Sequence, residues 1–443
     1  MGRYWLLSTC LIMVCFGITF AQQAPAPPAD NTACIDCHTK LNPAVVSDWK
    51  QSKHNQVNVG CVSCHGGDHT SAADVGNVKI ARPEVCAQCH QAQVEQSRRG
   101  MHARALATMR TQPNLHWRAM AQAVSEQGCA TCHGIGYPKN SEEVLFSKFG
   151  GVESGAQLWG AAACSACHSR HRFSLEEARQ PQACKFCHSG PDADQWGMYA
   201  SSKHGILNDL KQHKALPADA AVPTCQTCHM PGGDHEVIAG WGHWGVRFPL
   251  PSDPEWAADR SDVMRALNLL DPEGQPTYLT STVKSTGVVR FTEAEWQQQR
   301  DKMVKVCSQC HSQDFATKQL QSGDDTLRKA DHLMAEAIRV MAELYKDGVV
   351  EKPAGRGPAF PWITSFDPPP TTIELDLQNM FLVYRARTFQ GSFHNSPDYA
   401  FAKGLAEMQR SLIEIKDLAA QLRGHRPPPK AAGPRKAGTA KPK

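Results

Sequence analysis

Two features are missing from this sequence of 443 residues. Beyond residue 21 there is no apolar run of the roughly 20 residues that a helix needs to cross a membrane. There is also no cysteine left for a disulfide: Cys10 and Cys15 lie within the first 21 residues, and the remaining 16 of the 18 cysteines all belong to Cys-x-x-Cys-His motifs. A disulfide scaffold, the usual use of many cysteines in a secreted chain, is therefore excluded.

The first 21 residues are predicted to be a signal peptide. Arg3 supplies a short basic start, Leu6 to Phe20 an apolar run, and the small Ala21 a cleavage site. An uncleaved membrane anchor is the alternative, which the shortness of the run disfavours. We predict a Pro/Ala linker over residues 22–33 and a periplasmic location.

Neither sign of charge dominates the chain, whose formal net charge is +4. The one basic cluster is the tail from Arg423 to Lys443, which holds seven Lys or Arg, no acid and many Pro. Such a segment cannot bury enough apolar surface to fold. We therefore predict a disordered basic tail over residues 423–443 and no nucleic-acid partner.

Eight Cys-x-x-Cys-His motifs carry the chemistry. Two residues between the cysteines let both thiols bond the two vinyl groups of one haem, and the adjacent His becomes the proximal iron ligand. Zinc ribbons are the alternative, but a ribbon pairs its motifs and needs no His after each pair. The sequence thus predicts eight covalently bound haem c groups. The motifs are Cys34-Cys37-His38, Cys61-Cys64-His65, Cys86-Cys89-His90, Cys129-Cys132-His133, Cys164-Cys167-His168, Cys184-Cys187-His188, Cys225-Cys228-His229 and Cys307-Cys310-His311.

The density of motifs determines the predicted fold class, a mainly α multihaem cytochrome c. An octahaem domain over residues 34–311 is expected to have little regular structure around stacked haems, because haem faces replace an apolar core. About 75 residues separate His229 from Cys307, and their Pro/Gly-rich stretches predict an irregular excursion. A C-terminal domain of long helices is predicted over residues 312–422.

Three amphipathic helices are predicted in that C-terminal domain. The first runs from about Asp325 to Asp347, with Gly348 as its stop. The second covers roughly Thr372 to Thr388. In the third, Ser396 is the expected N-cap, Pro397 occupies the first helical position, and apolar residues recur at three-and-four spacing.

A sixth iron ligand separates relay haems from a catalytic haem, and histidines outside the motifs are the candidates. Three of them, His54, His102 and His204, share a setting of small and basic residues in predicted helices. His69 and His171 closely follow a motif and can each reach a neighbouring haem. We predict these five as distal ligands.

These residues resemble the octahaem hydroxylamine oxidoreductases over nearly the whole mature chain. The resemblance implies that the fourth motif holds the catalytic haem, with His133 below the iron and the distal side open, and that the other seven haems are bis-His. It also adds His235 and His394 to the distal ligands and implies a homotrimer. The segments that carry it are Cys167–His171, Gly190–Asp192, Gln195–Tyr199, Ser202–Gly205, Gly232–Val237 and Phe393–Tyr399.

The sequence also departs from this family. The family's Gly-Pro-Asp-His-Pro-Gln stretch has an Asp-His pair for proton movement, whereas here Asp192 remains, Ala193 replaces the imidazole, and Asp194 could act in its place at a lower pKa. In the family a tyrosine of one subunit cross-links the catalytic haem of the next. Tyr399, or else Tyr384, is the candidate here, but the run after Tyr399 differs from the family pattern.

The resemblance implies an oxidoreductase for small nitrogen compounds, hydroxylamine or nitrite. Nitrite reductases of related type carry Lys in the catalytic motif, whereas all eight motifs here end in His. The departures favour the reductive direction and a haem without a tyrosine cross-link. A periplasmic cytochrome or a quinone-linked protein is the expected redox partner. The alternative is a non-enzymatic electron conduit in which every haem is six-coordinate.

Overall fold

A computed structural model describes residues 30–105, 132, 135, 163–190, 194–238, 246, 249–277, 292–352, 363 and 371–424. The predicted signal peptide, residues 425–443 of the basic tail, Cys129, His133 and Asp192 lie outside the described residues, whereas Arg423 and Gly424, predicted as the start of the tail, are helical. The described part is helical: it contains no β-strand, and its single β-bridge joins Leu270 and Pro276. This confirms the predicted mainly α class. No described helix is both long and apolar enough to cross a membrane.

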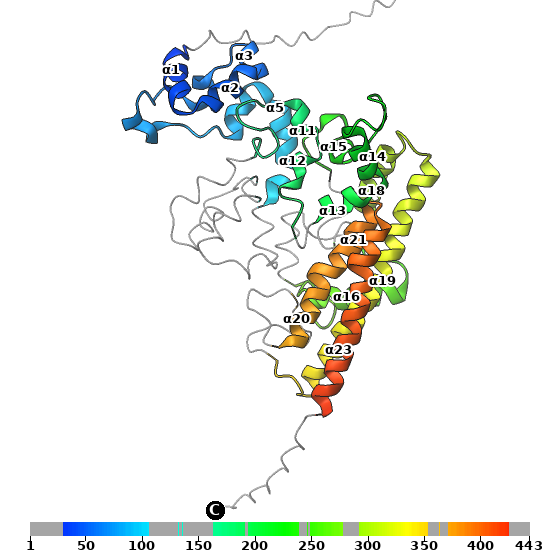
Figure 1. Cartoon of the computed structure of the whole chain (residues 1–443). Helices are drawn as coiled ribbons and strands as arrows, with labels where there is room; N and C mark the ends of the chain where they lie inside the picture. Colours follow the sequence, from blue (N-terminus) through cyan, green and yellow to red (C-terminus); the bar gives the residue numbers. More distant parts are fainter. Residues whose placement is uncertain are drawn as a thin grey trace, which may run out of the picture.

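The motif-bearing part consists of short helices joined by loops, at the upper end of Figure 1. Short elements are expected there, because each motif needs only about one helical turn; α4 and α15 are five residues long and consist of a motif alone. The elements are α1 (Thr32–Leu41), α2 (Pro43–Gln51), α3 (Lys53–Gln56), α4 (Cys61–His65), η1 (Ala72–Asn77), α5 (Pro83–Arg99), η2 (His102–Arg104), α11 (Leu175–Ala178), α12 (Gln182–Lys185), α13 (Gln195–Ser201), α14 (Lys203–Gln212), α15 (Cys225–His229) and η4 (Pro231–Gly233).

The gap before the last motif is more regular than predicted. It contains α16 (Pro254–Ala266) and α18 (Glu293–Cys307), so the expectation of an irregular excursion is wrong for these segments. Both helices have strong N-terminal signals. The Asp253 side chain caps α16, with Pro at its first position, and Thr292 and Glu295 form a reciprocal capping box at the start of α18.

The C-terminal helices are longer than predicted and lie side by side in Figure 1. Helix α19 (Gln313–Lys346) has 34 residues, begins directly after the last motif, and is followed by Gly348 at φ +64°, the predicted stop. The second helical run comprises α20 (Thr372–Asn379), the π-helical η6 (Met380–Arg385) and α21 (Ala386–Phe393), so it passes the predicted end at Thr388. The third comprises α22 (Pro397–Ala400), the π-helical η7 (Phe401–Leu405) and α23 (Ala406–Gly424).

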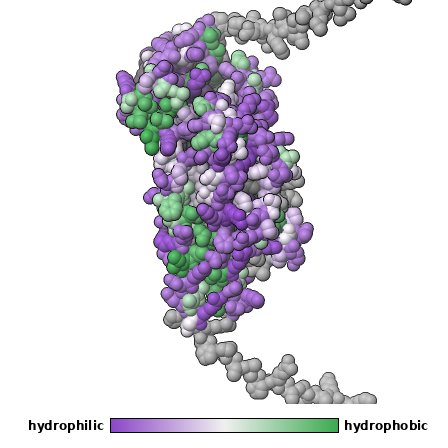
Figure 2. All heavy atoms as spheres, turned by 90° about the vertical axis from the view of Figure 1, so that its right-hand side faces the viewer, coloured by the Kyte–Doolittle hydropathy of each residue, from purple (hydrophilic) through white to green (hydrophobic). Residues whose placement is uncertain are grey.

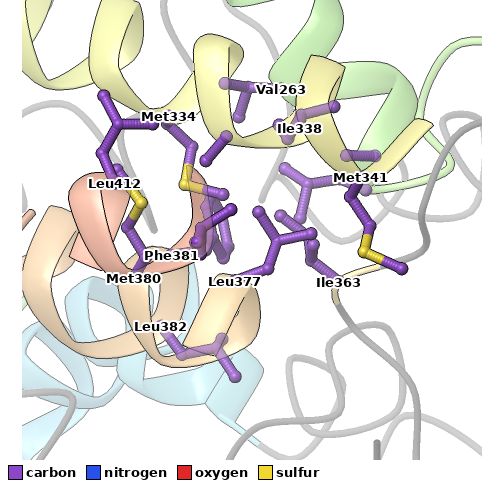
Figure 3. Close-up of a cluster of buried hydrophobic side chains, with 14 of the residues drawn as sticks. Val263, Met334, Ile338, Met341, Ile363, Leu377, Met380, Phe381, Leu382 and Leu412 are labelled. Atoms are coloured by element: carbon purple, nitrogen blue, oxygen red, sulfur yellow. The ribbon is translucent and has the colours of Figure 1, made fainter. Parts of the chain in front are cut away.

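Buried apolar side chains are concentrated in this helical part. One cluster joins α16, α19, α20, η6 and α23 and includes Met334, Ile338, Phe381 and Leu412 (Figure 3). A fully buried side chain of this size contributes about 1.5–3 kcal/mol. Among the described residues before Val246, only five hydrophobic side chains are buried. The motif-bearing part therefore has almost no apolar core of its own.

The surface face in Figure 2 is mostly hydrophilic. Apolar side chains gather there in patches near the N-terminal end and over the helical part. Single exposed hydrophobic side chains such as Phe401 and Ile413 belong to the C-terminal helices. Isolated exposed side chains such as these two are normal for a protein surface and are not evidence of a site.

Candidate haem-binding site

The described motif cysteines are half-buried or exposed, and none of them is in a disulfide. No cluster of three or more His, Cys, Asp or Glu side chains within the described ranges could hold a separate metal ion. A histidine directly follows the second cysteine of each motif. These residues fit a haem if a second histidine ring lies at the right distance from the motif histidine to share one iron.

Each of the seven described motif histidines lies opposite one histidine from outside the motifs. The ring centres are separated by 6.1–6.2 Å in every pair. Bonds from a metal to imidazole nitrogen are about 2.0 Å long, and that nitrogen lies about 1.1 Å from the ring centre, so two rings on one iron have centres about 6 Å apart. The geometry therefore fits a haem iron between the rings. The pairs are His38–His69, His65–His171, His90–His54, His168–His235, His188–His102, His229–His394 and His311–His204.

The pairs use all seven histidines that the sequence singled out, and they join distant parts of the chain. His394 comes from the last turn before α22 and faces His229 at the end of α15, which ties the helical part to the motif-bearing part. His133 lies outside the described residues, so its surroundings are not described. Cys132, in the same motif, is described and half-buried.

Burial keeps several of these imidazoles neutral. It lowers the pKa of His102 and of His394 to about 4, with smaller contributions from neighbouring histidines. It also lowers the pKa of His54, His168 and His204. Because imidazole binds a metal in its neutral form, these rings are in the required protonation state at neutral pH.

Three of the histidines outside the motifs sit on a repeated local structure. Ser52 and Ser202 are buried N-caps, and each hydroxyl donates to the carbonyl three residues earlier at 2.7 Å and accepts from the N–H three residues later at 3.2 Å. Gly100 has a similar extended backbone, with φ −74° and ψ 170°. In each case the histidine is the second residue that follows: His54, His204 and His102. The shared sequence setting therefore reflects a serine-capped helix start at His54 and His204, whereas Gly100 ends α5 just before η2.

The other ring nitrogen of several paired histidines has a defined partner, which fixes the ring orientation. In His65, His229 and His394, Nδ1 lies 2.7–3.0 Å from a backbone carbonyl oxygen. His188 is 3.1 Å from the side-chain oxygen of Gln195. In contrast, His69 lies 2.9 Å from a carboxylate oxygen, that of Asp74.

Interactions between thiols show which motifs are neighbours in space. They link the first motif to the second, then the third, fifth and sixth in turn. The sixth motif is also linked to the fourth and the seventh, and the seventh to the eighth. Hydrogen bonds join Cys34 with Cys61, Cys86 with Cys164, Cys187 with Cys132 and Cys184 with Cys225, and electrostatic interactions join Cys64 with Cys86, Cys167 with Cys184 and Cys228 with Cys307.

Asp194 and Tyr399, which the sequence placed near the reaction, are joined within one chain. Asp194 accepts from the Gly197 N–H at 2.9 Å as the N-cap of α13, and from the Tyr399 hydroxyl at 2.7 Å. Burial, followed by this hydrogen bond and the carboxylate charge, raises the pKa of Tyr399. Asp194 therefore holds a tyrosine and a helix start, roles that the sequence reasoning missed.

Gln195 and Gln390 were also missed. The Gln195 amide donates to the side-chain oxygen of Gln390 at 2.9 Å, so His188, Gln195 and Gln390 form a chain of contacts from the motif to α21. No local sequence pattern marks such a distant amide pair. Asp74 had a visible signal, because Ser71 and Asp74 have the spacing of a capping box.

Comparison with known proteins agrees with this geometry. The family described as seven times multi-haem cytochrome CxxCH matches residues 55–247 and 282–356, and the cytochrome c554 and c-prime family matches residues 19–66. This chain is therefore a member of the multihaem cytochromes with Cys-x-x-Cys-His motifs, which carry covalently bound haem c.

Two individual proteins show which multihaem cytochromes this chain is similar to. A probable nitrite reductase-hydroxylamine oxidoreductase fusion protein of Kuenenia stuttgartiensis is 24% identical over 88% of this chain and 51% of its own length, so this chain spans about half of it. The c-type polyheme cytochrome OmcB of Geobacter sulfurreducens is 35% identical, but only over 14% of this chain and 9% of its own length.

Two solved structures share the fold. One is the reducing HAO-like protein complex of Kuenenia stuttgartiensis, with a TM-score of 0.63, 23% identity and coverage of 88% of this chain and 85% of that chain. The other is a hypothetical multiheme protein with a TM-score of 0.63, 22% identity and coverage of 88% and 95%. The predicted resemblance to hydroxylamine oxidoreductase-type multihaem cytochromes is thereby confirmed.

Proposed function

We propose that this protein is an octahaem oxidoreductase that transfers several electrons to or from hydroxylamine or nitrite. Seven bis-His haems would relay electrons, each held between a motif histidine and its ring partner. The fourth motif, with Cys129, Cys132 and His133, would carry the haem whose open side takes the substrate. Haem c supplies electron storage along the array and an iron that binds a small nitrogen compound.

The observation that carries this proposal is how the histidines outside the motifs are used. Seven of them face motif histidines. Of the rest, the side chains of His213 and His332 are 74% and 51% exposed to solvent. The remaining candidates for the fourth iron are three residues outside the described ranges: His116, His243 and His425. An all-six-coordinate conduit would need one of these.

The relatives support the substrate class and the direction. The fusion protein is named for nitrite reduction and hydroxylamine oxidation, and the name of the similar complex describes it as reducing. Reduction of nitrite to ammonium takes six electrons, more than one iron can store. We propose the reductive direction for this chain, because Asp192 lacks the histidine neighbour of the oxidative pattern. Asp192 would move protons at the open haem.

The setting of the protein is part of the proposal. Export to the periplasm follows from the signal-like first 21 residues, and a periplasmic cytochrome or a quinone-linked protein would exchange electrons with the array. A homotrimer is proposed from the family resemblance.

The test is the electron paramagnetic resonance spectrum of the ferric holoprotein. We expect one high-spin signal among low-spin signals, and its conversion to low spin by cyanide or hydroxylamine. The variants His116→Ala and His243→Ala should leave this spectrum unchanged. A wholly low-spin spectrum, or a new high-spin signal in either variant, would support the electron conduit instead.

A further inference from the structure

The paired histidines differ in the charge of the group that their second ring nitrogen contacts. His65, His188, His229 and His394 face neutral oxygens of the backbone or of an amide. His69 faces the carboxylate of Asp74 at 2.9 Å. Among the hydrogen bonds of the described residues, His69 is the one paired histidine whose ring nitrogen contacts a carboxylate.

Asp74 is held in place to accept this hydrogen bond. Its two oxygens lie 3.1 Å from the Thr70 N–H, one accepts from the Thr70 hydroxyl at 2.9 Å, and the other accepts from the Ser71 N–H at 2.9 Å. The contacts make Asp74 part of the capping box of η1. The His69 and Asp74 side chains are only 24% and 26% exposed. This is a fixed contact, unlike a mobile surface ion pair.

A carboxylate on one nitrogen of an imidazole makes the opposite nitrogen a stronger donor to a metal. A stronger donor and a nearby negative charge both stabilise ferric over ferrous iron, which lowers the reduction potential. The opposite ring, His38, does not contribute to this effect, since its Nδ1 is buried without a hydrogen-bond partner in the described structure.

We propose that Asp74 is a positioning residue that makes the first haem the low-potential end of the array. Thiol Cys34 of motif one interacts with Cys61 of motif two, and α1, which carries motif one, lies at the outer end of the motif-bearing part in Figure 1, so this haem would be terminal. An electron from an external donor that reduces iron at this end would then move inward at decreasing free energy, while the Nδ1 proton stays on His69. The inference rests on the proposed ligation of the first haem by His38 and His69, and it specifies where electrons enter for reduction.

The test is a spectroelectrochemical titration of the full-length holoprotein with the variant Asp74→Asn. The amide keeps an oxygen for the His69 N–H but removes the charge. We expect the most negative one-electron component to shift upwards, with about a tenfold higher ratio of ferrous to ferric iron at a fixed potential, which corresponds to about 59 mV. The other components should stay in place.

Asp68→Asn is the matched control. Asp68 carries the same charge in the same loop, but it is exposed and pairs with Lys79 at 3.1 Å. Its removal should leave the titration unchanged, and Asp74→Glu, which keeps the charge, should return the low component towards its original position. Superimposable curves for Asp74→Asn and the parent protein, or equal shifts in Asp74→Asn and Asp68→Asn, would overturn the inference.

The same samples separate this inference from the proposed catalysis. The low-spin spectrum reports whether the His38–His69 pair is kept in each variant. Absence of a cyanide-binding high-spin haem would contradict the catalytic proposal while leaving the potential shift intact. A high-spin haem together with no shift would contradict only the role of Asp74.

Discussion

At the scale of single residues, the segment around Asp194 departs most from the expected arrangement. The sequence offered Asp194 as a replacement for a missing imidazole. In the structure its carboxylate is occupied by the Gly197 N–H and the Tyr399 hydroxyl. A carboxylate with both oxygens in such contacts is a structural acceptor, and Asp192 is left as the candidate for proton movement.

The Tyr399 contact bears directly on the cross-link that occurs in the resembling family. A hydroxyl that donates to Asp194 within its own chain, with its pKa raised by burial, stays a neutral phenol. We expect denaturing mass spectrometry of the holoprotein to give single subunits. We also expect Tyr399→Phe to leave that mass pattern unchanged while costing about 1–2 kcal/mol of stability through the lost hydrogen bond. Subunits that remain joined after unfolding, and separate in Tyr399→Phe, would show that the cross-link forms.

Which histidines lie in pairs could be predicted from the sequence, but which rings face each other could not. The repeated settings of His54 and His204 are local, since a serine cap two residues earlier defines each helix start. The pairing of His229 with His394 depends on packing of α15 against a distant helix end. No local spacing encodes a contact of that kind.

At the scale of elements, Ser396 and Pro397 begin α22 as predicted, whereas the helix start inferred from apolar periodicity was too late in the chain. Helix α19 begins at Gln313 and not near Asp325, although its first part contains Gly323, a poor helix former. A Cβ atom at Gly323 would lie 2.8 Å from the Phe393 ring, so this glycine permits close packing of α21. Tertiary contacts thus extend a helix that the sequence pattern alone did not predict.

Asp331 of α19 is predicted to be the most sensitive polar residue of the helical part. It is fully buried and accepts from Arg260 of α16 at 2.7 Å and from Arg385 of η6 at 2.6 Å. Burial raises its pKa, but the two arginines outweigh burial, so the net pKa lies below the usual range. Its stabilising contribution is therefore present above the unfolded pKa of about 3.9 and is lost as the pH falls below it.

We expect Asp331→Asn to cost about 3–5 kcal/mol, because two buried guanidinium groups lose their counter-charge. Denaturant unfolding followed by far-ultraviolet circular dichroism measures the loss. Asp314→Asn is the control on the same helix: Asp314 pairs with Lys318 at the surface, where a change of about 0–1 kcal/mol is expected. Equal, small losses in the two variants would contradict the role of Asp331.

At the scale of the whole molecule, the motifs form a line with one branch. The first, second, third, fifth, sixth, seventh and eighth motifs follow one another through hydrogen bonds or electrostatic interactions between their thiols, and the fourth is joined to the sixth by the hydrogen bond between Cys132 and Cys187. The number of motifs was evident from the sequence. The branch could not be predicted from the sequence, because it depends on an interaction between motifs that are not consecutive in the chain.

The branch predicts that loss of the fourth haem separates catalysis from electron storage. Cys132→Ser removes a thiol needed for attachment, while the seven histidine pairs and the line through the sixth motif remain intact. We expect protein that lacks this haem, as shown by its mass, to lose turnover of nitrite and hydroxylamine to background and to keep most of its low-spin spectrum. Cys37→Ser, at the far end of the line, should remove one low-spin haem and keep the cyanide-binding signal. Retained turnover in a Cys132→Ser protein without the fourth haem would move the catalytic site to another motif, because substrate would then react at an iron held by one of the seven pairs.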